Sequence, residues 1–246
     1  MMKVIGVIPA RFASGRMPGK PIADICGKPM IWWVYQSAIK SKLLDSVVVA
    51  TDDERIYEKC EQYSINVIMT SENHDTPTSR LYEVSTKIDA DLYLMLMGDE
   101  PLINSDSFSL IIPEDKIDED YVACLTNIVD RPSEVVDFSN QKCVTNANRE
   151  VLMISRSPIP YPKGTLDFEY EKVTGIQLFS KTALEFYNKT PKSLLEIAEE
   201  NDLMRFVENG IKVKAIKSTY KTISVDTPKD LEAVRKIIGE SDIYDK

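Results

Sequence analysis

Short apolar segments alternate with helical segments through the first hundred residues, and this alternation limits the folds open to the chain. The apolar runs at 4–8, 46–50 and 92–97 are too short for helices, and each is followed by a polar loop. Between them, the pattern predicts helices at 29–43, 54–63 and 78–88 and one further short strand at 66–69. Strands that alternate with helices predict an α/β protein with a mostly parallel sheet that helices cover on both faces.

The polar loops after these strands are the first candidates for a binding site. Ligands of such sheets bind at the carboxyl ends of the strands. The loops that follow Ile8, Ala50 and Met97 should therefore lie along one edge of the sheet. Residues far apart in the sequence can meet there.

The second half of the chain is less regular. We expect strands at 122–128, 151–155, 212–216 and 222–225. The stretch 157–162 holds too many prolines for a helix or a central strand. Two helices are expected, at 194–208 with Gly210 as its C-cap and at 230–238 after the N-cap Thr227 and Pro228. No linker or internal repeat divides the chain, so it reads as one domain.

The charge balance excludes one class of partner and leaves another open. A formal net charge of −9 in 246 residues argues against nucleic-acid binding, which needs a broad basic face. No apolar stretch approaches the roughly 20 residues that span a bilayer, and Met1 opens no signal peptide. The four cysteines have neither metal-ligand nor redox spacing. These features are typical of a reduced, cytoplasmic protein without a membrane partner.

One loop concentrates positive charge in this acidic chain. The segment 8–21, IPARFASGRMPGKP, carries Arg11, Arg16 and Lys20 on a backbone whose glycines allow close approach by a ligand. Phosphate groups need this combination of fixed positive charge and inward-facing donors. The spacing matches neither the P-loop nor the dinucleotide motif. Phosphate binding is therefore the functional interpretation, and a solvated turn whose cations aid solubility is the alternative.

Two aspartates form a second candidate cluster. Asp99 and Asp226 each follow an apolar strand and each lie in a turn beside a proline. Mg²⁺ is commonly held by one or two carboxylates together with substrate phosphates. The pair could supply such a site at the sheet edge. The alternatives are a turn aspartate before Glu100-Pro101 and a helix-start residue before Thr227-Pro228.

The loop at 8–21 resembles, throughout its length, the signature loop of the CMP-Kdo synthetase family, and acylneuraminate cytidylyltransferases carry a related loop. The resemblance continues in order along nearly the whole chain. Its further motifs are Gly27-Lys28-Pro29-Met30, Val48-Val49-Ala50-Thr51-Asp52, Thr70-Ser71 with His74, Thr78 and Arg80, Gly98-Asp99-Glu100-Pro101, Ser155-Arg156 with Ile159-Pro160, Glu208-Asn209-Gly210-Ile211 and Val225-Asp226-Thr227-Pro228.

This resemblance implies a fold, a reaction and a set of partners. The fold would be that of a nucleotide-diphospho-sugar transferase (GT-A-like), a single domain over 1–246 with a smaller dimerisation excursion. Its parts would be a nucleotide-binding half at about 1–110, an acceptor-binding and dimerisation part at about 111–225, and the metal-ligand turn with the C-terminal helix at 226–246. The reaction would be a Mg²⁺-dependent transfer of CMP from CTP to a sugar acid with release of pyrophosphate, by a homodimer.

The resemblance also assigns roles to residues. The catalytic residues would be Arg16, Lys20, Asp99 and Asp226, and the metal ligands would be Asp99 and Asp226. The nucleotide would contact Pro9, Ala10, Arg11, Ser14, Arg16, Lys20, Thr78, Arg80, Gly98 and Asp99. Arg80 has an alternative role as an exposed helical arginine. His74, the sole histidine, is expected to be structural.

The acceptor side departs from the family. The glutamine that usually precedes Gly-Asp-Glu-Pro is Met97, and Gln177 stands where the family carries an aromatic or histidine side chain near Gly175-Ile176. Arginine, which binds carboxylates with two parallel hydrogen bonds, is kept. The acceptor would therefore be acidic but different from Kdo, and it would contact Arg156, Gln177, Asp202 and Arg205. The alternative role of Arg205 is that of a partly exposed helix residue paired with Asp202.

Two rival functions remain open at this point. The first is an ordinary CMP-Kdo synthetase, with an unaltered acceptor. The second is a non-catalytic protein that binds CTP, although Arg16, Lys20, Asp99 and Asp226 are all present.

Overall fold

The computed structural model describes residues 2–13, 17–115, 117, 119–165 and 167–240. Its strands are β1 (Val4–Ala10), β2 (Asp24–Ile25), β3 (Lys28–Pro29), β4 (Ser46–Thr51), β5 (Val67–Met69), β6 (Leu92–Leu96), β7 (Val122–Ile128), β8 (Lys142–Thr145), β9 (Val151–Ser155), β10 (Glu171–Ser180) and β11 (Val213–Lys217). Its helices are η1 (Lys20–Ile22), α1 (Met30–Ile39), α2 (Glu54–Gln62), α3 (Pro77–Lys87), η2 (Ser105–Ser107), α4 (Phe108–Ile111), α5 (Pro132–Val136), α6 (Lys181–Lys189), α7 (Leu194–Glu199), α8 (Leu203–Glu208) and α9 (Pro228–Gly239).

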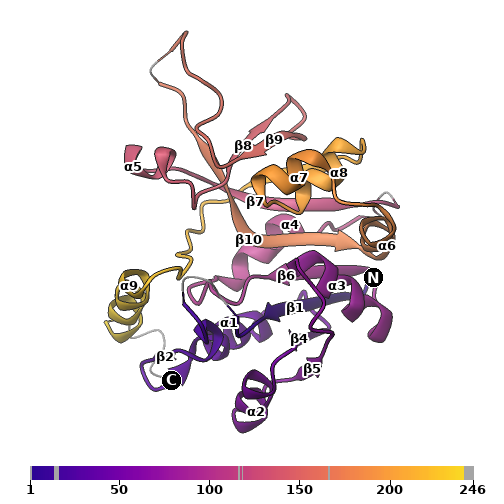
Figure 1. Ribbon diagram of the computed structural model, residues 1–246, viewed down its shortest axis with the longest axis vertical. Coiled ribbons are helices and arrows are strands. Elements are labelled where there is room, and N and C mark those ends of the chain that lie inside the picture. Colours follow the sequence, from indigo (N-terminus) through magenta and orange to yellow (C-terminus); the bar gives the residue numbers. More distant parts are fainter. Residues whose placement is uncertain (1, 14–16, 116, 118, 166, 241–246) are drawn as a thin grey trace.

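One mixed sheet forms the centre of the molecule (Figure 1). Within the described residues its strand order is β11-β7-β10-β6-β1-β4-β5, and β8 and β9 extend it from β10. Strand β1 pairs in parallel with β4 and β6, and β5 continues this parallel half. Strand β10 is antiparallel to both β6 and β7. The expected α/β class with a mostly parallel sheet is confirmed.

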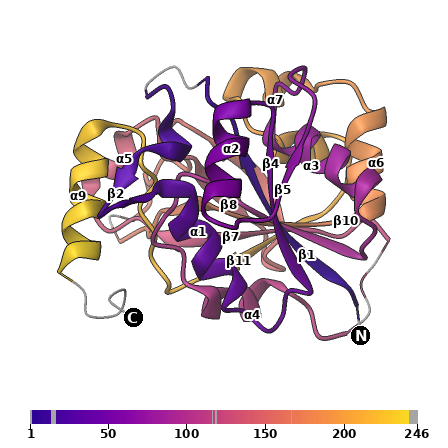
Figure 2. The ribbon, with the colours of Figure 1, turned by 90° about the horizontal axis from the view of Figure 1, so that it is seen from below.

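Helices cover both faces of the sheet, as the alternating pattern predicts. Buried side chains of α1, α2 and α4 pack on one face, and those of α3, α6 and α8 pack on the other. In Figure 2, α1 and α2 lie on one side of β1, β4 and β5, and α3 and α6 lie on the other. Every residue of β1 is buried, which explains its continuous apolar run. Among the helices of the described residues, none has the length and apolar character needed to cross a membrane.

Local sequence signals explain where several helices begin. The side chain of Asp53 accepts a hydrogen bond from the Arg55 backbone at the start of α2. Thr227 and Asp230 form a reciprocal capping box at the start of α9, with Pro228 in the first turn. Pro29, in contrast, is the N-cap of α1 in an extended conformation and lies just outside the helix. Its fixed φ angle suits that position equally well.

Two expectations for the second half are wrong, and one long strand was missed. The single helix expected at 194–208 is two helices, because Glu200 adopts a left-handed conformation between α7 and α8. The expected strand at 222–225 has no strand pairing. The long strand β10 was not predicted, although it links the two halves of the sheet. Its register shifts between Val173 and Gln177, so its alternating pattern is interrupted there.

The last helix returns to the beginning of the chain. Leu231, Val234 and Ile238 of α9 form a small core with Ile25, Trp33 and neighbouring residues of the N-terminal part. In Figure 1, α9 lies beside β2 and the start of α1. This packing carries the turn before α9 to the edge of the sheet where β1 and β6 end.

Candidate active site

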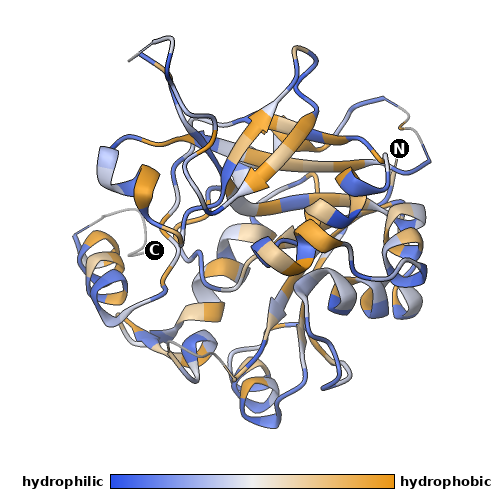
Figure 3. Ribbon diagram, turned by 45° about the horizontal axis from the view of Figure 1, so that its top comes forward, coloured by the Kyte–Doolittle hydropathy of each residue, from blue (hydrophilic) through white to orange (hydrophobic). Residues whose placement is uncertain are grey.

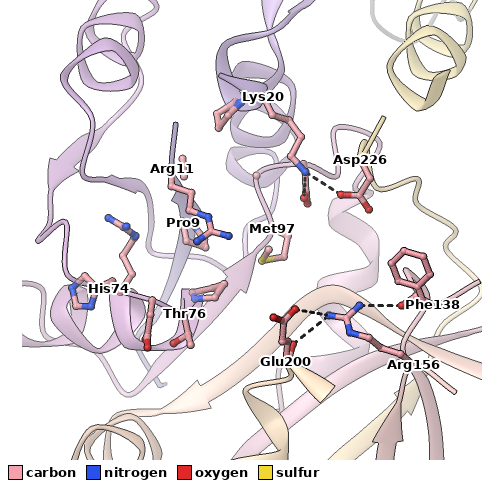
Figure 4. A pocket seen from close by; sticks show the side chains of 17 residues that line it. Pro9, Arg11, Lys20, His74, Thr76, Met97, Phe138, Arg156, Glu200 and Asp226 are labelled. Carbon is pink, nitrogen blue, oxygen red and sulfur yellow. Dashed lines mark hydrogen bonds and ion pairs between the residues drawn. The ribbon is translucent and has the colours of Figure 1, made fainter. Parts of the chain in front are cut away.

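A pocket of about 670 Å³ opens at the carboxyl ends of β1 and β6 (Figure 4). It is lined by Pro9, Ala10, Arg11, Lys20, Pro21, His74, Asp75, Thr76, Pro77, Arg80, Met97, Gly98, Asp99, Phe138, Arg156, Glu200 and Asp226. These residues come from both halves of the sheet. The location is the one expected from the strand ends.

Lys20, Asp99 and Asp226 meet at one end of this pocket. The Lys20 Nζ donates to Asp99 Oδ2 at 2.6 Å and to Asp226 Oδ1 at 3.2 Å. All three side chains are at most one-fifth exposed. These contacts join residues that are 79 and 206 positions apart. The positive loop and the two distant acids therefore lie together, as the sequence predicts.

Backbone contacts hold each of the three in place. Gly19 has a φ of 71° and donates to the Phe12 carbonyl, which closes the loop before Lys20. The Asp99 carbonyl accepts from the Val225 N–H at 2.8 Å, so the turns that carry the two aspartates are directly bonded. Any shift of one turn is thereby transmitted to the other.

The donor set of this cluster fits Mg²⁺. The described residues contain no group of three or more His, Cys, Asp or Glu side chains gathered as a metal site. Asp99 and Asp226 nevertheless place two carboxylates around the Lys20 ammonium, and carboxylate oxygens are hard ligands. Mg²⁺ is often held by two carboxylates plus substrate phosphates. Asp99 and Asp226 are the residues that would hold it.

One wall of the pocket is formed by the end of β1 with the loop that follows it and by the start of α3. Pro9, Ala10 and Arg11 line it, together with Gly98. Arg80 is almost fully buried rather than exposed, and its guanidinium donates to Thr70 Oγ1 and, at 2.7 Å, to Asp52. Asp52 and Thr70 directly follow β4 and β5, so these hydrogen bonds fix Arg80 at the pocket wall.

One predicted nucleotide contact lies away from the pocket lining, and two fall outside the described residues. Thr78 is fully buried beside the pocket and does not line it, and its backbone N–H donates to Asp202 Oδ2 at 3.1 Å. Ser14 and Arg16 lie outside the described residues.

His74 lines the pocket but its ring is held by neighbouring side chains. Its Nε2 lies 2.5 Å from Glu83 Oε2, and its Nδ1 lies 3.2 Å from Ser79 Oγ. Burial raises the pKa of Glu83, but hydrogen bonds from Lys87, Ser71 and His74 outweigh it and lower that pKa to about 2. Glu83 is therefore ionised and orients the imidazole. This arrangement agrees with the structural role expected for His74.

Arg156 is the cation at the opposite end of the pocket. Its Nε, NH1 and NH2 donate to the carbonyls of Glu199, Phe138 and Glu200. A guanidinium has five N–H donors, so these three bonds leave two of them for a ligand. Figure 4 shows Arg156 with Phe138 and Glu200, across Met97 from Lys20 and Asp226. Arg156 is therefore a fixed cation that can bind an anionic group.

The other three predicted acceptor residues do not line the pocket. Arg205 is buried, and both its Nε and NH2 donate to the Glu196 carboxylate. Asp202 Oδ2 accepts a hydrogen bond from the Thr78 N–H at the start of α3, and burial raises the pKa of Asp202. The Gln177 Oε1 is buried between strands and has no hydrogen-bond partner among the described residues. Arg205 and Asp202 thus have protein partners away from the pocket lining, and their acceptor roles stay predictions.

Phe138 and Glu200 line the pocket but were not predicted. Glu200 was assigned to a continuous helix, whereas it forms the left-handed break between α7 and α8 (φ 48°). Phe138 lies in the loop after α5, whose carbonyls at Asp137 and Asn140 accept from the buried Lys142 Nζ. The sequence carries no signal for the placement of Phe138, whereas Asn201-Asp202, a pair typical of helix starts, marks the break at Glu200.

A buried carboxyl joins the Asp99 loop to β10. Glu100 Oε1 accepts from the Gly175 N–H at 2.8 Å, and the Met97 N–H donates to the Gly175 carbonyl at 2.9 Å. Burial, with the nearby Asp99 charge, raises the pKa of Glu100 to about 8. A Cβ on Gly175 would lie 2.7 Å from both the Glu100 carboxyl and the Met97 Cβ. Gly175 is thus required for this close approach.

We expect Gly175→Ala to damage both stability and turnover. The new methyl group must displace Glu100 or the β6 end, which costs about 1–3 kcal/mol and shifts the loop that carries Asp99. Urea denaturation should show the loss of stability, and initial rates should fall. Gly164→Ala is the matched control, because no atom lies within 4 Å of that Cβ position. Equal stability of the two variants would contradict this role of Gly175.

Comparisons with known proteins agree with the geometry. A family model described as cytidylyltransferase matches residues 5–219. The 3-deoxy-manno-octulosonate cytidylyltransferase of Escherichia coli is 37% identical over 241 residues, which cover 98% of this chain and 98% of that protein. The protein of the same name from Fusobacterium nucleatum is 39% identical over 244 residues, covering 98% and 99%.

Solved structures show the same fold. The structure of CMP:2-keto-3-deoxy-manno-octonic acid synthetase complexed with CTP matches with a TM-score of 0.88 and 37% identity, over 97% of this chain and 99% of that one. The inositol-1-phosphate CTP transferase from T. maritima matches with a TM-score of 0.66 at 14% identity, over 97% of both chains. The second likeness supports the fold alone.

Proposed function

The chain belongs to the cytidylyltransferase family, and from this premise we propose that it transfers CMP from CTP to an acidic sugar and releases pyrophosphate. The observation that carries the proposal is the pocket itself. It has Lys20 and two carboxylates at one end and the fixed cation Arg156 at the other. The relative of known structure was solved with CTP, which supports CTP as the donor.

The residues of the pocket account for the chemistry of this transfer. Pro9, Ala10 and the nearby backbone border the base, while Lys20 and Arg11 attract the triphosphate. An acceptor oxygen bonds to the α-phosphorus as the bond to the bridging oxygen breaks, the hydroxyl proton leaves to solvent, and no covalent enzyme intermediate forms. Lys20 stabilises the charge that develops on the departing pyrophosphate. Asp99 and Asp226 would hold Mg²⁺, which supplies polarisation of the α-phosphate when bound.

For the acceptor, we propose a sugar acid that differs from Kdo. Met97 puts an apolar thioether in the pocket between the nucleotide end and Arg156, where the family usually has a glutamine. A hydroxyl that lost its partner there would forfeit on the order of 1 kcal/mol or more. The second candidate is Kdo, and the relatives named 3-deoxy-manno-octulosonate cytidylyltransferase favour it.

A pyrophosphate-release assay tests both the reaction and the acceptor. The protein is incubated with CTP, Mg²⁺ and each member of a panel of sugar acids that includes Kdo. Turnover with another acid and weak turnover with Kdo would support the altered acceptor, whereas efficient turnover with Kdo would refute it. CTP binding without pyrophosphate release in the presence of any acceptor would refute the enzyme assignment and favour the non-catalytic alternative.

We expect Arg156→Lys to raise the KM for the acceptor without changing the KM for CTP. Lysine carries the charge but cannot keep three carbonyl contacts while binding a carboxylate with two parallel hydrogen bonds. The KM for the acceptor should rise about 10- to 100-fold, which is the loss of one charge-assisted hydrogen bond. Arg131→Lys, at the exposed N-cap of α5, is the control. A rise in both KM values would contradict the assignment.

We also propose that the protein is a homodimer and that the part at about 111–225 supplies the contact. Large apolar residues on β9, on α7 and in the loop between β9 and β10 are exposed there. Figure 1 labels β9 and α7, and Figure 3 colours the same ribbon by residue hydropathy. They include Leu152, Tyr161, Leu194 and Ile197, and Tyr161 and Leu194 are more than 80% exposed. Exposed apolar groups that cluster in this way mark interaction surfaces. Analytical ultracentrifugation measures the oligomeric state.

The cytoplasmic location remains a prediction.

A further inference from the structure

The contact between Lys20 and the two aspartates has a consequence for the order of binding. Its Nζ uses two of its three N–H donors on Asp99 and Asp226. The three groups are largely shielded from solvent, with exposed fractions of 12%, 17% and 20%, so the ion pairs are less screened than on the surface. A divalent cation and this ammonium compete for the same pair of oxygen ligands.

We propose that Lys20 is a built-in cation that blocks the metal site until the phosphates of a nucleoside triphosphate draw its ammonium group away. This inference rests on the proposed function, because it requires Asp99 and Asp226 to be the metal ligands. The flexible four-carbon stem of lysine lets its charge move between partners. Arg11 and Lys20 both line the pocket, so the phosphates of a bound nucleotide would be the anions that compete for Lys20.

The proposal makes metal binding dependent on the nucleotide. Without a nucleotide, the ammonium lies between the carboxylates and repels a divalent ion. With a nucleotide, Lys20 turns to the phosphates, and the two carboxylates become available together with phosphate oxygens. Such coupling is reciprocal. The metal therefore binds the protein–nucleotide complex more tightly than the free protein, and the nucleotide binds the protein–metal complex more tightly than the free protein.

The test measures Mn²⁺ binding to the free protein, from the electron paramagnetic resonance signal of unbound Mn²⁺. Lys20→Met should bind Mn²⁺ at least about tenfold tighter than the wild type, because a charge at this distance shifts ion affinities by one to three orders of magnitude. Lys20→Gln, a second neutral variant, should show the same gain. Lys20→Arg keeps the charge and should show none, and Lys42→Met, which removes an exposed lysine, is the control.

Two further measurements make the result specific. Adding Asp99→Asn to Lys20→Met should abolish the gain in Mn²⁺ affinity, which places the ion at this site. A non-hydrolysable CTP analogue should increase the Mn²⁺ affinity of the wild type by a larger factor than that of Lys20→Met. Equal or weaker Mn²⁺ binding by both neutral variants, relative to the wild type, would overturn the proposal.

The failure of this proposal is distinguishable from the failure of the proposed function. If wild-type protein releases pyrophosphate from CTP while the neutral variants gain no Mn²⁺ affinity, Lys20 does not block the site but the enzyme assignment stands. If the variants gain affinity while wild-type protein neither binds nor turns over CTP, the blocking role stands and the enzyme assignment fails.

Discussion

Replacing Asp99 or Asp226 by asparagine should reduce turnover by about 10²- to 10³-fold or more, with little change in the fold. Each carboxylate lies at the pocket within hydrogen-bond distance of the Lys20 Nζ. Asparagine keeps the size of the side chain but removes the negative charge that a metal site requires. The measurement is the initial rate of pyrophosphate release, with circular dichroism and urea denaturation to verify the fold.

The backbone explains why the fold should survive this change. The Val225 N–H donates to the Asp99 carbonyl and not to its side chain, so asparagine leaves that bond in place. Asp106→Asn, on the exposed start of η2, is the matched control and should keep wild-type activity. Near-normal rates in both Asp99→Asn and Asp226→Asn would refute the metal assignment. A loss of rate that excess Mg²⁺ partly restores would support it.

The parallel half of the fold could be predicted because each of its elements carries a local signal. Strands β1 and β4 are buried along nearly their whole length, so their sequences are continuous apolar runs. The helices after β4 and β5 have side-chain caps, Asp53 for α2 and Thr76 for α3. Strand β10 lacks a comparable signal, because its register shift at Gly175 breaks the alternation between buried and exposed positions.

The site was predictable only as far as strand order determines it. Polar residues at the carboxyl ends of parallel strands share one edge, so Asp99 could be placed near the loop that carries Lys20. Arg156 comes from the antiparallel part, and its prediction came from the family resemblance. The break at Glu200 had a local signal that the prediction did not use: Asn201 and Asp202 are residue types that favour helix starts, and Asn201 Oδ1 accepts from the Leu203 N–H at the start of α8. The partners of Arg205 depend on tertiary packing that no local pattern encodes.

Arg205→Met should destabilise the folded protein strongly and should not alter the acceptor KM of the protein that remains folded. Arg205 and Glu196 are 6% and 3% exposed, and both guanidinium contacts with the carboxylate are short, at 2.6 and 2.5 Å. Removing the cation leaves the Glu196 charge buried and unpaired, which typically costs about 3–5 kcal/mol. The free energy of unfolding in urea measures this loss.

The same pair of residues offers a test against the acceptor-binding interpretation. The double variant Arg205→Met/Glu196→Leu removes the stranded charge along with its partner, so it should recover most of the lost stability, since apolar replacements of buried ion pairs are often neutral. It should still lose about 1 kcal/mol, because Glu196 also accepts from the Ser193 N–H in the capping box of α7. If Arg205→Met instead kept its stability while its KM for the acceptor rose at least about tenfold, as the loss of one charged contact would cause, Arg205 would be an acceptor residue. Its buried pairing with Glu196 would then not describe the working enzyme.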